Sequence, residues 1–202
     1  PVDVSTSSRA TIGGMAGNNS AGGRSIRYGI MRDNVLSINT ILSDGSKAHF
    51  GLAKKGLSGL EKVFPKLIKI AEKNQKEIET RYPKVLRRVG GYNLDALLPD
   101  TLASRPGSIG NEKDINLSHL IVGSEGTLAY STSIKLKLSP LPPPKIMALC
   151  HFSTFYEAMD SAQHIVKLDP VAVELIDSTM ISLGGSIPIF SKTIDDFVVN
   201  DP

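Results

Sequence analysis

The sequence predicts an α+β fold, with a mainly antiparallel sheet and flanking helices. Three observations lead to this class. Residues 35–51 contain two strand-like runs, residues 57–81 repeat their apolar side chains at helical spacing, and residues 127–138 alternate between apolar and polar side chains. We expect the helix to pack on the sheet.

The two runs in VLSINTILSDGSKAHFG (35–51) are separated by Asp44-Gly45. This dipeptide tolerates the positive φ angles of a tight turn. Residues 35–51 are therefore expected to form a β-hairpin.

The helical period runs from Leu57 to about Arg81. Pro65 is tolerated only in the first turn of a helix, where its missing N–H leaves no bond unmade. A helix is therefore expected to start near Pro65 and to end before Pro83. The apolar positions that set the period are Leu60, Val63, Phe64, Leu67, Ile68, Ile70 and Ala71.

Two proline-bearing segments interrupt the regular structure. The polar run TLASRPGSIGNEKD (101–114) is expected to form a surface excursion. The run PLPPP (140–144) cannot continue a sheet and stiffens the chain. It predicts a boundary between a first domain, residues 1–143, and the beginning of a second, residues 144–202.

The second domain starts with a strand, a helix and a strand. KIMALCHF (145–152) and VAVELID (171–177) have strand character, and residues 153–169 have helical character with Ser153 or Thr154 as the N-cap. This order is typical of a βαβ-like beginning, followed by a weak helix. About sixty residues make a marginal domain, so this unit is expected to be truncated.

Composition argues against several classes of protein. The 202 residues are 41% hydrophobic and carry a net charge of +3, with basic residues spread among acidic ones, which argues against nucleic-acid binding. Cys150 is the one cysteine, which excludes an intrachain disulfide. No membrane span or signal segment is evident. The start at Pro1 leads us to expect a piece of a longer polypeptide.

The segment ATIGGMAGNNSAGGRSIRYG (10–29) holds six glycines and two adjacent asparagines. Clustered glycines let a ligand approach the main chain and can present several N–H groups to one anion, such as a pyrophosphate. The spacing fits neither a P-loop nor a Rossmann fingerprint. A surface loop without a ligand is the alternative, and the GSEG turn within residues 121–128 changes this balance little by itself.

Four motifs taken together distinguish a ligand-binding protein from one with ligand-free surface loops better than any single motif does. They are ATIGGMAGNNSAGGRSIRYG followed by MRDNVLSINTILSDG, then RRVGGYNLDALL, then HLIVGSEGTLAYSTSIKLKLSPLP, and finally VAVELID. In this order they resemble the flavin-binding domain of the p-cresol methylhydroxylase and vanillyl-alcohol oxidase superfamily. The similarity is greatest to its D-lactate, glycolate and D-2-hydroxyglutarate dehydrogenase branch.

The resemblance implies FAD held between two α+β subdomains, with a ferredoxin-like cap beside the substrate. This chain would carry the second subdomain and the start of the cap. The residues at the matching positions would line the cofactor: Thr11, Gly13, Gly14, Gly17, Asn18, Asn19, Ala21, Gly22, Ser25, Tyr28, Gly29, Ile121, Val122, Glu125 and Gly126. Residues 97–118 depart from the family pattern as an inserted loop.

No catalytic or metal-binding residue is named from the sequence. The four histidines lack ligand spacing, so a metal or catalytic role is not expected of them. Arg24, Arg27 and Arg32 could hold a substrate carboxylate, but solvated or ion-paired arginines explain them more simply. Tyr92 could face the flavin or be buried in the core.

The resemblance also implies an activity for the longer protein: oxidation of a D-2-hydroxy acid to the 2-oxo acid. Its electrons would pass to a quinone, a cytochrome, an electron-transfer flavoprotein or a fused iron-sulfur domain. The expected location is cytoplasmic, including the inner membrane face. The alternative is a noncatalytic nucleotide-binding or interaction module. The isolated chain is expected to bind FAD weakly or not at all and to self-associate through its exposed cleft face.

Overall fold

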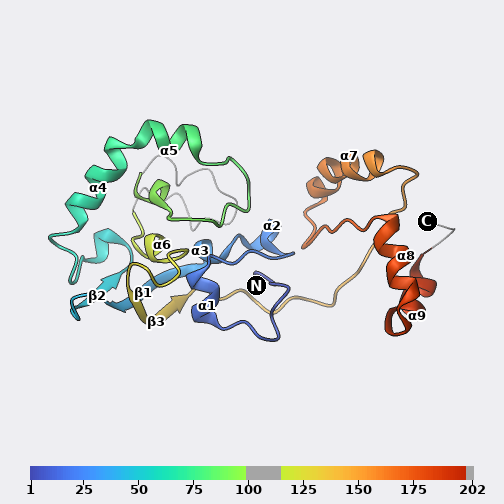
Figure 1. Cartoon of the computed structure of the whole chain (residues 1–202), viewed down its shortest axis with the longest axis horizontal. Helices are drawn as coiled ribbons and strands as arrows, with labels where there is room; N and C mark the ends of the chain where they lie inside the picture. Colours follow the sequence, from blue (N-terminus) through green and yellow to red (C-terminus); the bar gives the residue numbers. More distant parts are fainter. Residues whose placement is uncertain (99–114, 199–202) are drawn as a thin grey trace. The chain divides into compact units, whose positions relative to one another are not determined.

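The computed structural model describes residues 1–98 and 115–198, so the excursion expected at 101–114 lies outside the described residues. The chain divides into two compact units, Pro1–Ser139 and Pro140–Pro202 (Figure 1). Each unit is described by itself. No helix in the described ranges combines the length and apolar character needed to cross a membrane.

The first unit is built on a three-stranded antiparallel sheet of order β2-β1-β3. The strands are β1 (Val35–Ile41), β2 (Lys47–Phe50) and β3 (Tyr130–Leu136), and Ile38 pairs with both Phe50 and Ile134. The turn has Gly45 at φ +82°, as the Asp44-Gly45 dipeptide predicts. The expected hairpin, the third strand and the α+β class are confirmed.

Two consecutive helices follow, α4 (Phe64–Lys73) and α5 (Gln75–Arg81). Pro65 lies in the first turn of α4, as predicted. Asn74 separates the helices, and its side-chain Nδ2 donates to the carbonyl oxygen of Ile70 at 2.7 Å. Their main neighbour is the short 3₁₀-helix η2 (Leu94–Leu97), and not the sheet as expected; η2 in turn contacts α6 (Ser118–Ile121), which packs on β1.

Short elements complete the first unit. They are α1 (Ile12–Gly17), α2 (Ser25–Tyr28), α3 (Met31–Asn34), the 3₁₀-helix η1 (Ala53–Lys55) and α6 (Ser118–Ile121). α1 and α6 come from the two glycine motifs, and both supply residues to the core.

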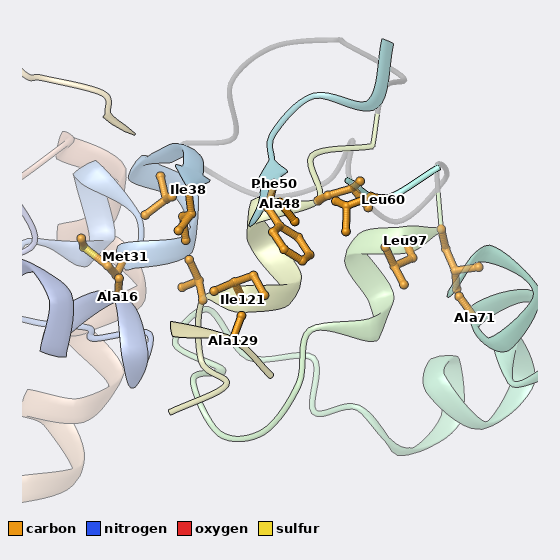
Figure 2. Packing of buried hydrophobic residues seen from close by; sticks show 14 of the residues in the cluster. Ala16, Met31, Ile38, Ala48, Phe50, Leu60, Ala71, Leu97, Ile121 and Ala129 are labelled. Carbon is orange, nitrogen blue, oxygen red and sulfur yellow. The ribbon is translucent and has the colours of Figure 1, made fainter. Parts of the chain in front are cut away.

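The core of the first unit gathers side chains from nearly every element (Figure 2). Ile38 and Phe50 come from the hairpin, Ala71 from α4, Leu97 from η2 and Ile121 from α6, and all five are buried. Ala16 in α1 belongs to the same cluster. The glycine-rich segment is therefore anchored to the core through one face of α1.

The second unit is helical where it is regular. Its helices are α7 (Phe155–Ile165), η4 (Val166–Leu168), α8 (Ser178–Ser186) and α9 (Pro188–Phe197). Thr154 is the N-cap of α7, because its Oγ1 accepts from the Glu157 N–H at 3.2 Å while the Glu157 carboxylate accepts from the Thr154 N–H at 3.1 Å. The predicted helix and its cap are confirmed.

The two strands expected in this unit do not form. Residues 145–152 and 171–177 run as irregular chain, and many of their apolar side chains, such as Ile146, are exposed. A strand needs a hydrogen-bonding partner along its length. The described residues of this unit provide none, so the βαβ-like beginning is not observed.

Candidate functional site

The glycine-rich segment starts with a capped turn of helix. Thr11 is the N-cap of α1, and its Oγ1 accepts from the main-chain N–H of Gly14 at 3.1 Å. The helix ends after one and a half turns, and Asn19 then takes a left-handed conformation with φ +53°. Asparagine tolerates this conformation better than most residues, which explains how the chain reverses here.

The two glycine motifs lie against each other although about one hundred residues separate them. The main-chain N–H of Gly123 donates to the Ala16 carbonyl at 3.0 Å, and that of Glu125 donates to the Gly17 carbonyl at 3.0 Å. The GSEG turn therefore closes the carboxyl end of α1. The resemblance implied that these motifs share one ligand, and the structure joins them by main-chain hydrogen bonds.

Several glycines in these motifs are required by the fold itself. A Cβ on Gly22 would overlap the carbonyl groups of Val2 and Asp3. Gly29 has φ +72° and lies against the Asp33 side chain, and Gly123 has φ +86° and lies against Asn19. Side chains at these positions are excluded by strain or by close packing.

Gly13 and Gly17 differ from the other glycines. A Cβ on Gly13 would meet nothing within 4 Å in the described chain, and one on Gly17 would only reach ordinary contact with Glu125 Cα at 4.0 Å. Neither residue has a positive φ angle. The two lie four residues apart, on one face of α1. Packing and conformation therefore leave the absence of side chains on this face unexplained.

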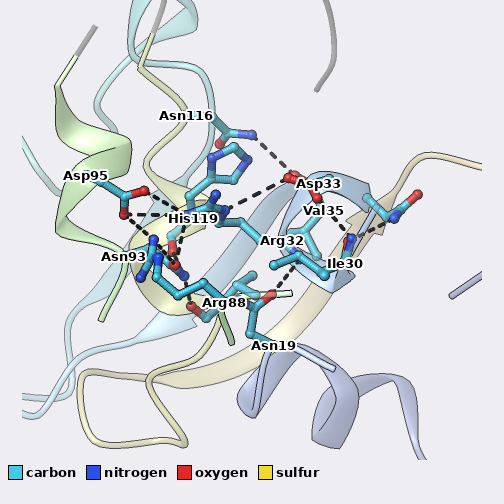
Figure 3. Close-up of polar contacts among 12 residues, drawn as sticks. Asn19, Ile30, Arg32, Asp33, Val35, Arg88, Asn93, Asp95, Asn116 and His119 are labelled. Carbon is cyan, nitrogen blue, oxygen red and sulfur yellow. Dashed lines mark hydrogen bonds and ion pairs between the residues drawn. The ribbon is translucent and has the colours of Figure 1, made fainter. Parts of the chain in front are cut away.

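A buried polar network starts at Asn19, two residues after the end of α1 (Figure 3). Asn19 Oδ1 accepts from the main-chain N–H of Arg32 at 2.9 Å. The Arg32 guanidinium donates to Asn93 Oδ1 at 2.8 Å and lies 3.4 Å from the Asp95 carboxylate. Arg88 pairs with Asp95 at 2.6 Å. One carboxylate thus bridges two buried guanidinium groups.

Asn93 extends the network to the second glycine motif. Its Nδ2 donates to the carbonyl oxygens of Val122 at 2.8 Å and His119 at 3.1 Å, at the end of α6 and directly before GSEG. The network consequently connects three motifs: the glycine-rich segment, RRVGGYNLD and HLIVGSEG. It therefore fixes the position of the GSEG turn relative to the end of α1.

Burial dominates the electrostatics of this network. Desolvation lowers the pKa of Arg32, against the opposing effects of Asp95 and Asp33, and desolvation raises the pKa of the Asp33 carboxyl. Asn19 Nδ2, Arg32 Nε, Arg88 Nε and His119 Nδ1 are buried without a hydrogen-bond partner among the described residues. Buried polar atoms without a partner are costly, so these four atoms lower the net stabilisation that the network provides.

His119 gives a prediction for the dependence of stability on pH. Burial is the main cause that lowers its pKa from the ordinary value of 6.5 to about 3, and the charge of Arg32 lowers it further in the same direction. Below pH 6.5 the histidine of the unfolded chain binds a proton, whereas that of the folded chain does not. The contribution of the neutral His119 to the free energy of unfolding is therefore at its maximum above pH 6.5. It is lost as the pH falls toward 3, by about 1.4 kcal/mol per pH unit.

The pH prediction is checked by urea denaturation of the chain and of His119→Gln between pH 7 and pH 4. We expect the stability of the wild-type chain to fall more steeply than that of the variant, while carboxylate titrations are common to both proteins. Parallel pH profiles for the two proteins would contradict a neutral, buried His119.

The residues expected to line the cofactor fall into three groups by exposure. Some face solvent, namely Thr11, Gly13, Gly14, Asn18, Glu125 and Gly126. Others are half-buried, namely Gly17, Ala21, Gly22 and Tyr28. The rest are buried, namely Asn19, Ser25, Gly29, Ile121 and Val122. The solvent-facing group includes residues of both motifs.

Some of these residues have local structural roles. Ser25 Oγ accepts from the main-chain N–H of Gly22 at 3.0 Å, and Asn18 Oδ1 accepts from the Ser20 hydroxyl at 2.6 Å. Asn19 has no exposed surface. These side chains therefore hold the local conformation of the segment.

The candidate substrate-binding residues are mostly occupied by other contacts. Arg24 pairs with Asp3 at 3.0 Å, and the guanidinium of Arg32 is buried in the network beside Asp95. Tyr92 is 43% exposed, so it is not a core residue, and its hydroxyl lies 2.8 Å from Thr127 Oγ1. Within residues 1–98 and 115–198, no three His, Cys, Asp or Glu side chains are placed to hold a metal ion.

Arg88, Asn93 and Asp95 were not recognised from the sequence as parts of the site's support. They lie in RRVGGYNLD, which was noted only as a motif. The sequence does offer one signal for their role: two charged residues and an amide lie within eight positions of one another, around two glycines. Asn93 and Asp95 also contact residues that lie 26 to 63 positions away, and periodicity cannot supply such pairings.

Comparison with known proteins points to the same family. Residues 1–51 match the model of the FAD binding domain. The chain is 29% identical over 191 residues to a D-2-hydroxyglutarate dehydrogenase of Pseudomonas putida, covering 90% of the chain and 18% of that protein. It is 29% identical over 184 residues to a probable mitochondrial D-lactate dehydrogenase of Danio rerio, covering 90% of the chain and 26% of that protein.

A third relative is the glycolate oxidase subunit GlcD of Bacillus subtilis, 27% identical over 180 residues and 89% of the chain. The chain spans about a fifth to a quarter of the length of these relatives. The FAD binding domain expected from the motifs is confirmed over residues 1–51, and these relatives are named for the hydroxy acids of the branch that the motifs resemble.

Proposed function

We propose that residues 11–29 and 121–126 form one wall of an FAD site in a longer flavoenzyme that oxidises a D-2-hydroxy acid. The observation that supports this proposal is the face of α1 that carries Gly13 and Gly17, which we call the bare face. The GSEG turn is hydrogen-bonded to the carboxyl end of the same helix. A Cβ on Gly13 would meet no atom within 4 Å in the described chain, and one on Gly17 would reach only Glu125 Cα at 4.0 Å. A ligand that uses the close approach to the main chain explains the absence of both side chains.

The proposed wall fits a dinucleotide by its donor set. The solvent-facing residues at the amino end of α1 include Gly13, and Glu125 and Gly126 stand at the opposite end. Peptide N–H groups suit phosphate oxygens, whereas the Glu125 carboxylate suits the donating hydroxyls of a sugar. Orientation of the cofactor would thus follow from the order of these residues.

FAD supplies the redox chemistry when it is bound: it accepts the equivalent of a hydride from the carbon that carries the hydroxyl group. The role of this chain is to bind and orient. Cations for the substrate carboxylate and a base for the hydroxyl proton are still required. Arg24 and Arg32 are engaged elsewhere, so we assign no catalytic residue within this chain.

The domain identities, the acceptor and the location belong to the same proposal. Residues 1–143 would be the second subdomain of the FAD binding domain, and residues 144–202 the start of the substrate cap. One relative carries the name D-lactate dehydrogenase [cytochrome], mitochondrial. A cytochrome is therefore one candidate acceptor, and a mitochondrial location stands beside the cytoplasmic one.

The function is tested on an extended polypeptide, in which this chain is expressed with its flanking coding sequence. We expect it to bind FAD and its flavin absorbance to bleach with D-2-hydroxyglutarate, D-lactate or glycolate in the absence of NAD. An extended polypeptide that stays colourless and takes up no FAD would rule out the proposal. Flavin that binds but is not bleached by any of the three acids would favour the noncatalytic module.

The isolated chain is expected to bind FAD weakly or not at all. One wall alone loses both the contacts and the preorganisation that the opposite wall would supply. Fluorescence titration measures this directly. Tight, stoichiometric uptake of FAD by residues 1–202 would contradict the proposed need for a second wall.

A further inference from the structure

Positive charge is concentrated in one short segment. Residues 62–76 carry five lysines and one glutamate, a net charge of +4, whereas the whole chain carries +3. The remainder of the chain therefore sums to −1. We call the five side chains Lys62, Lys66, Lys69, Lys73 and Lys76 the lysine ridge.

The ridge faces solvent on α4, on the start of α5 and, at Lys62, just before α4. Lys66, Lys69 and Lys73 follow the i, i+3, i+7 spacing that aligns side chains on one helix face. Leu67, Ile68 and Ala71 pack into the core from the other face. All five lysines are exposed. In Figure 1 the two helices run along an edge of the first unit, away from α1.

The ridge is not neutralised within the protein. Glu77, the acidic residue next to Lys76, pairs with Arg81. None of the five lysines forms an ion pair with another of the described residues. Unpaired like charges on one helix repel one another. An anionic surface that meets the whole ridge would relieve this repulsion.

Two apolar side chains accompany the lysines. Ile70 is 49% exposed and Val63 is 41% exposed, and both lie beside the ridge. Exposed aliphatic side chains next to lysines are typical of helices that lie in the headgroup region of a membrane. Nucleic-acid surfaces, by contrast, commonly add arginine and stacking aromatic residues, which are absent from the ridge.

We propose that the lysine ridge binds the headgroups of an anionic lipid surface, with Ile70 and Val63 entering the interface. The complementary charge and the exposed aliphatic pair favour a lipid surface over an acidic protein. This proposal is independent of FAD binding, because the ridge lies on a different part of the first unit.

The test is co-flotation of the 202-residue chain with phosphatidylcholine vesicles that contain about one third phosphatidylglycerol. The ridge variant replaces four lysines by glutamine: Lys66→Gln, Lys69→Gln, Lys73→Gln and Lys76→Gln. The control variant makes the same change in charge at exposed lysines elsewhere: Lys47→Gln, Lys135→Gln, Lys145→Gln and Lys167→Gln. Circular dichroism verifies that both variants keep their helices.

We expect binding to the anionic vesicles, no binding to pure phosphatidylcholine, and loss of binding at high salt. Each basic residue near an anionic leaflet contributes about 5-fold, so the ridge variant should bind about 600-fold more weakly. The control variant should lose far less. The proposal is wrong if the chain does not bind the anionic vesicles. It is also wrong if the ridge variant binds them as tightly as the control variant does. Binding to soluble polyglutamate without vesicle binding would assign the ridge to an acidic protein instead.

Discussion

Replacing Asp95 by asparagine is expected to destabilise the first unit by about 3–5 kcal/mol. The Asp95 carboxylate bridges the buried Arg32 and Arg88 guanidinium groups, at 3.4 Å and 2.6 Å. Asparagine keeps the shape but leaves two buried cations facing each other without the shared anion. Since small domains are stable by only about 5–15 kcal/mol, a large part of the fold's stability would be lost.

Urea denaturation followed by far-UV circular dichroism measures the effect of Asp95→Asn. Glu61→Gln, an exposed site in the same unit, is the matched control and should change stability by less than about 0.5 kcal/mol. Adding Arg88→Met to Asp95→Asn should recover part of the loss, because one unpaired charge is removed. A loss below about 1 kcal/mol for Asp95→Asn would show that the network does not hold these motifs together.

Replacing Gly22 by alanine is the second large effect. The new Cβ would overlap main-chain atoms of Val2 and Asp3, which cannot rotate away as a flexible side chain would. The amino-terminal segment must therefore move, exposing Val2 and Val4, which are now 1% and 8% exposed. It would also break the Arg24–Asp3 ion pair. The expected loss is about 3 kcal/mol.

Gly13→Ala is the control for Gly22→Ala, because the same substitution is made where a Cβ meets nothing within 4 Å. Alanine is the better helix former, so Gly13→Ala should be neutral or stabilising by up to about 1 kcal/mol. Urea denaturation and limited proteolysis of residues 1–10 report the two outcomes. Equal stability of both variants would contradict the packing of the amino-terminal segment on Gly22.

The elements predicted correctly are those with local signals. Asp44-Gly45 favours a tight turn whatever surrounds it, Pro65 is restricted to the first turn of a helix, and Thr154 with Glu157 forms a capping box between neighbouring residues. Each of these signals depends on a few consecutive residues. Their structures therefore follow from the sequence without knowledge of the tertiary contacts.

The predictions that failed depended on distant partners. Residues 145–152 and 171–177 have strand-like composition, but composition does not supply the neighbouring strand that a sheet requires. The Arg32–Asp95 pair could not be inferred either, because it joins residues 63 positions apart. The nearness of Gly17 and Glu125 was expected only through the family resemblance, which carries information on long-range contacts that spacing lacks.

The central claim is that the bare face of α1 is the place where FAD approaches the main chain. The most direct measurement is the FAD dissociation constant of Gly13→Val in the extended polypeptide, with Gly185→Val as control. Both glycines are helical, and both have open space where a Cβ would stand. We predict at least about tenfold weaker binding for Gly13→Val, about 1.4 kcal/mol, with unchanged unfolding and no change for the control. Undiminished FAD affinity in Gly13→Val would contradict the claim.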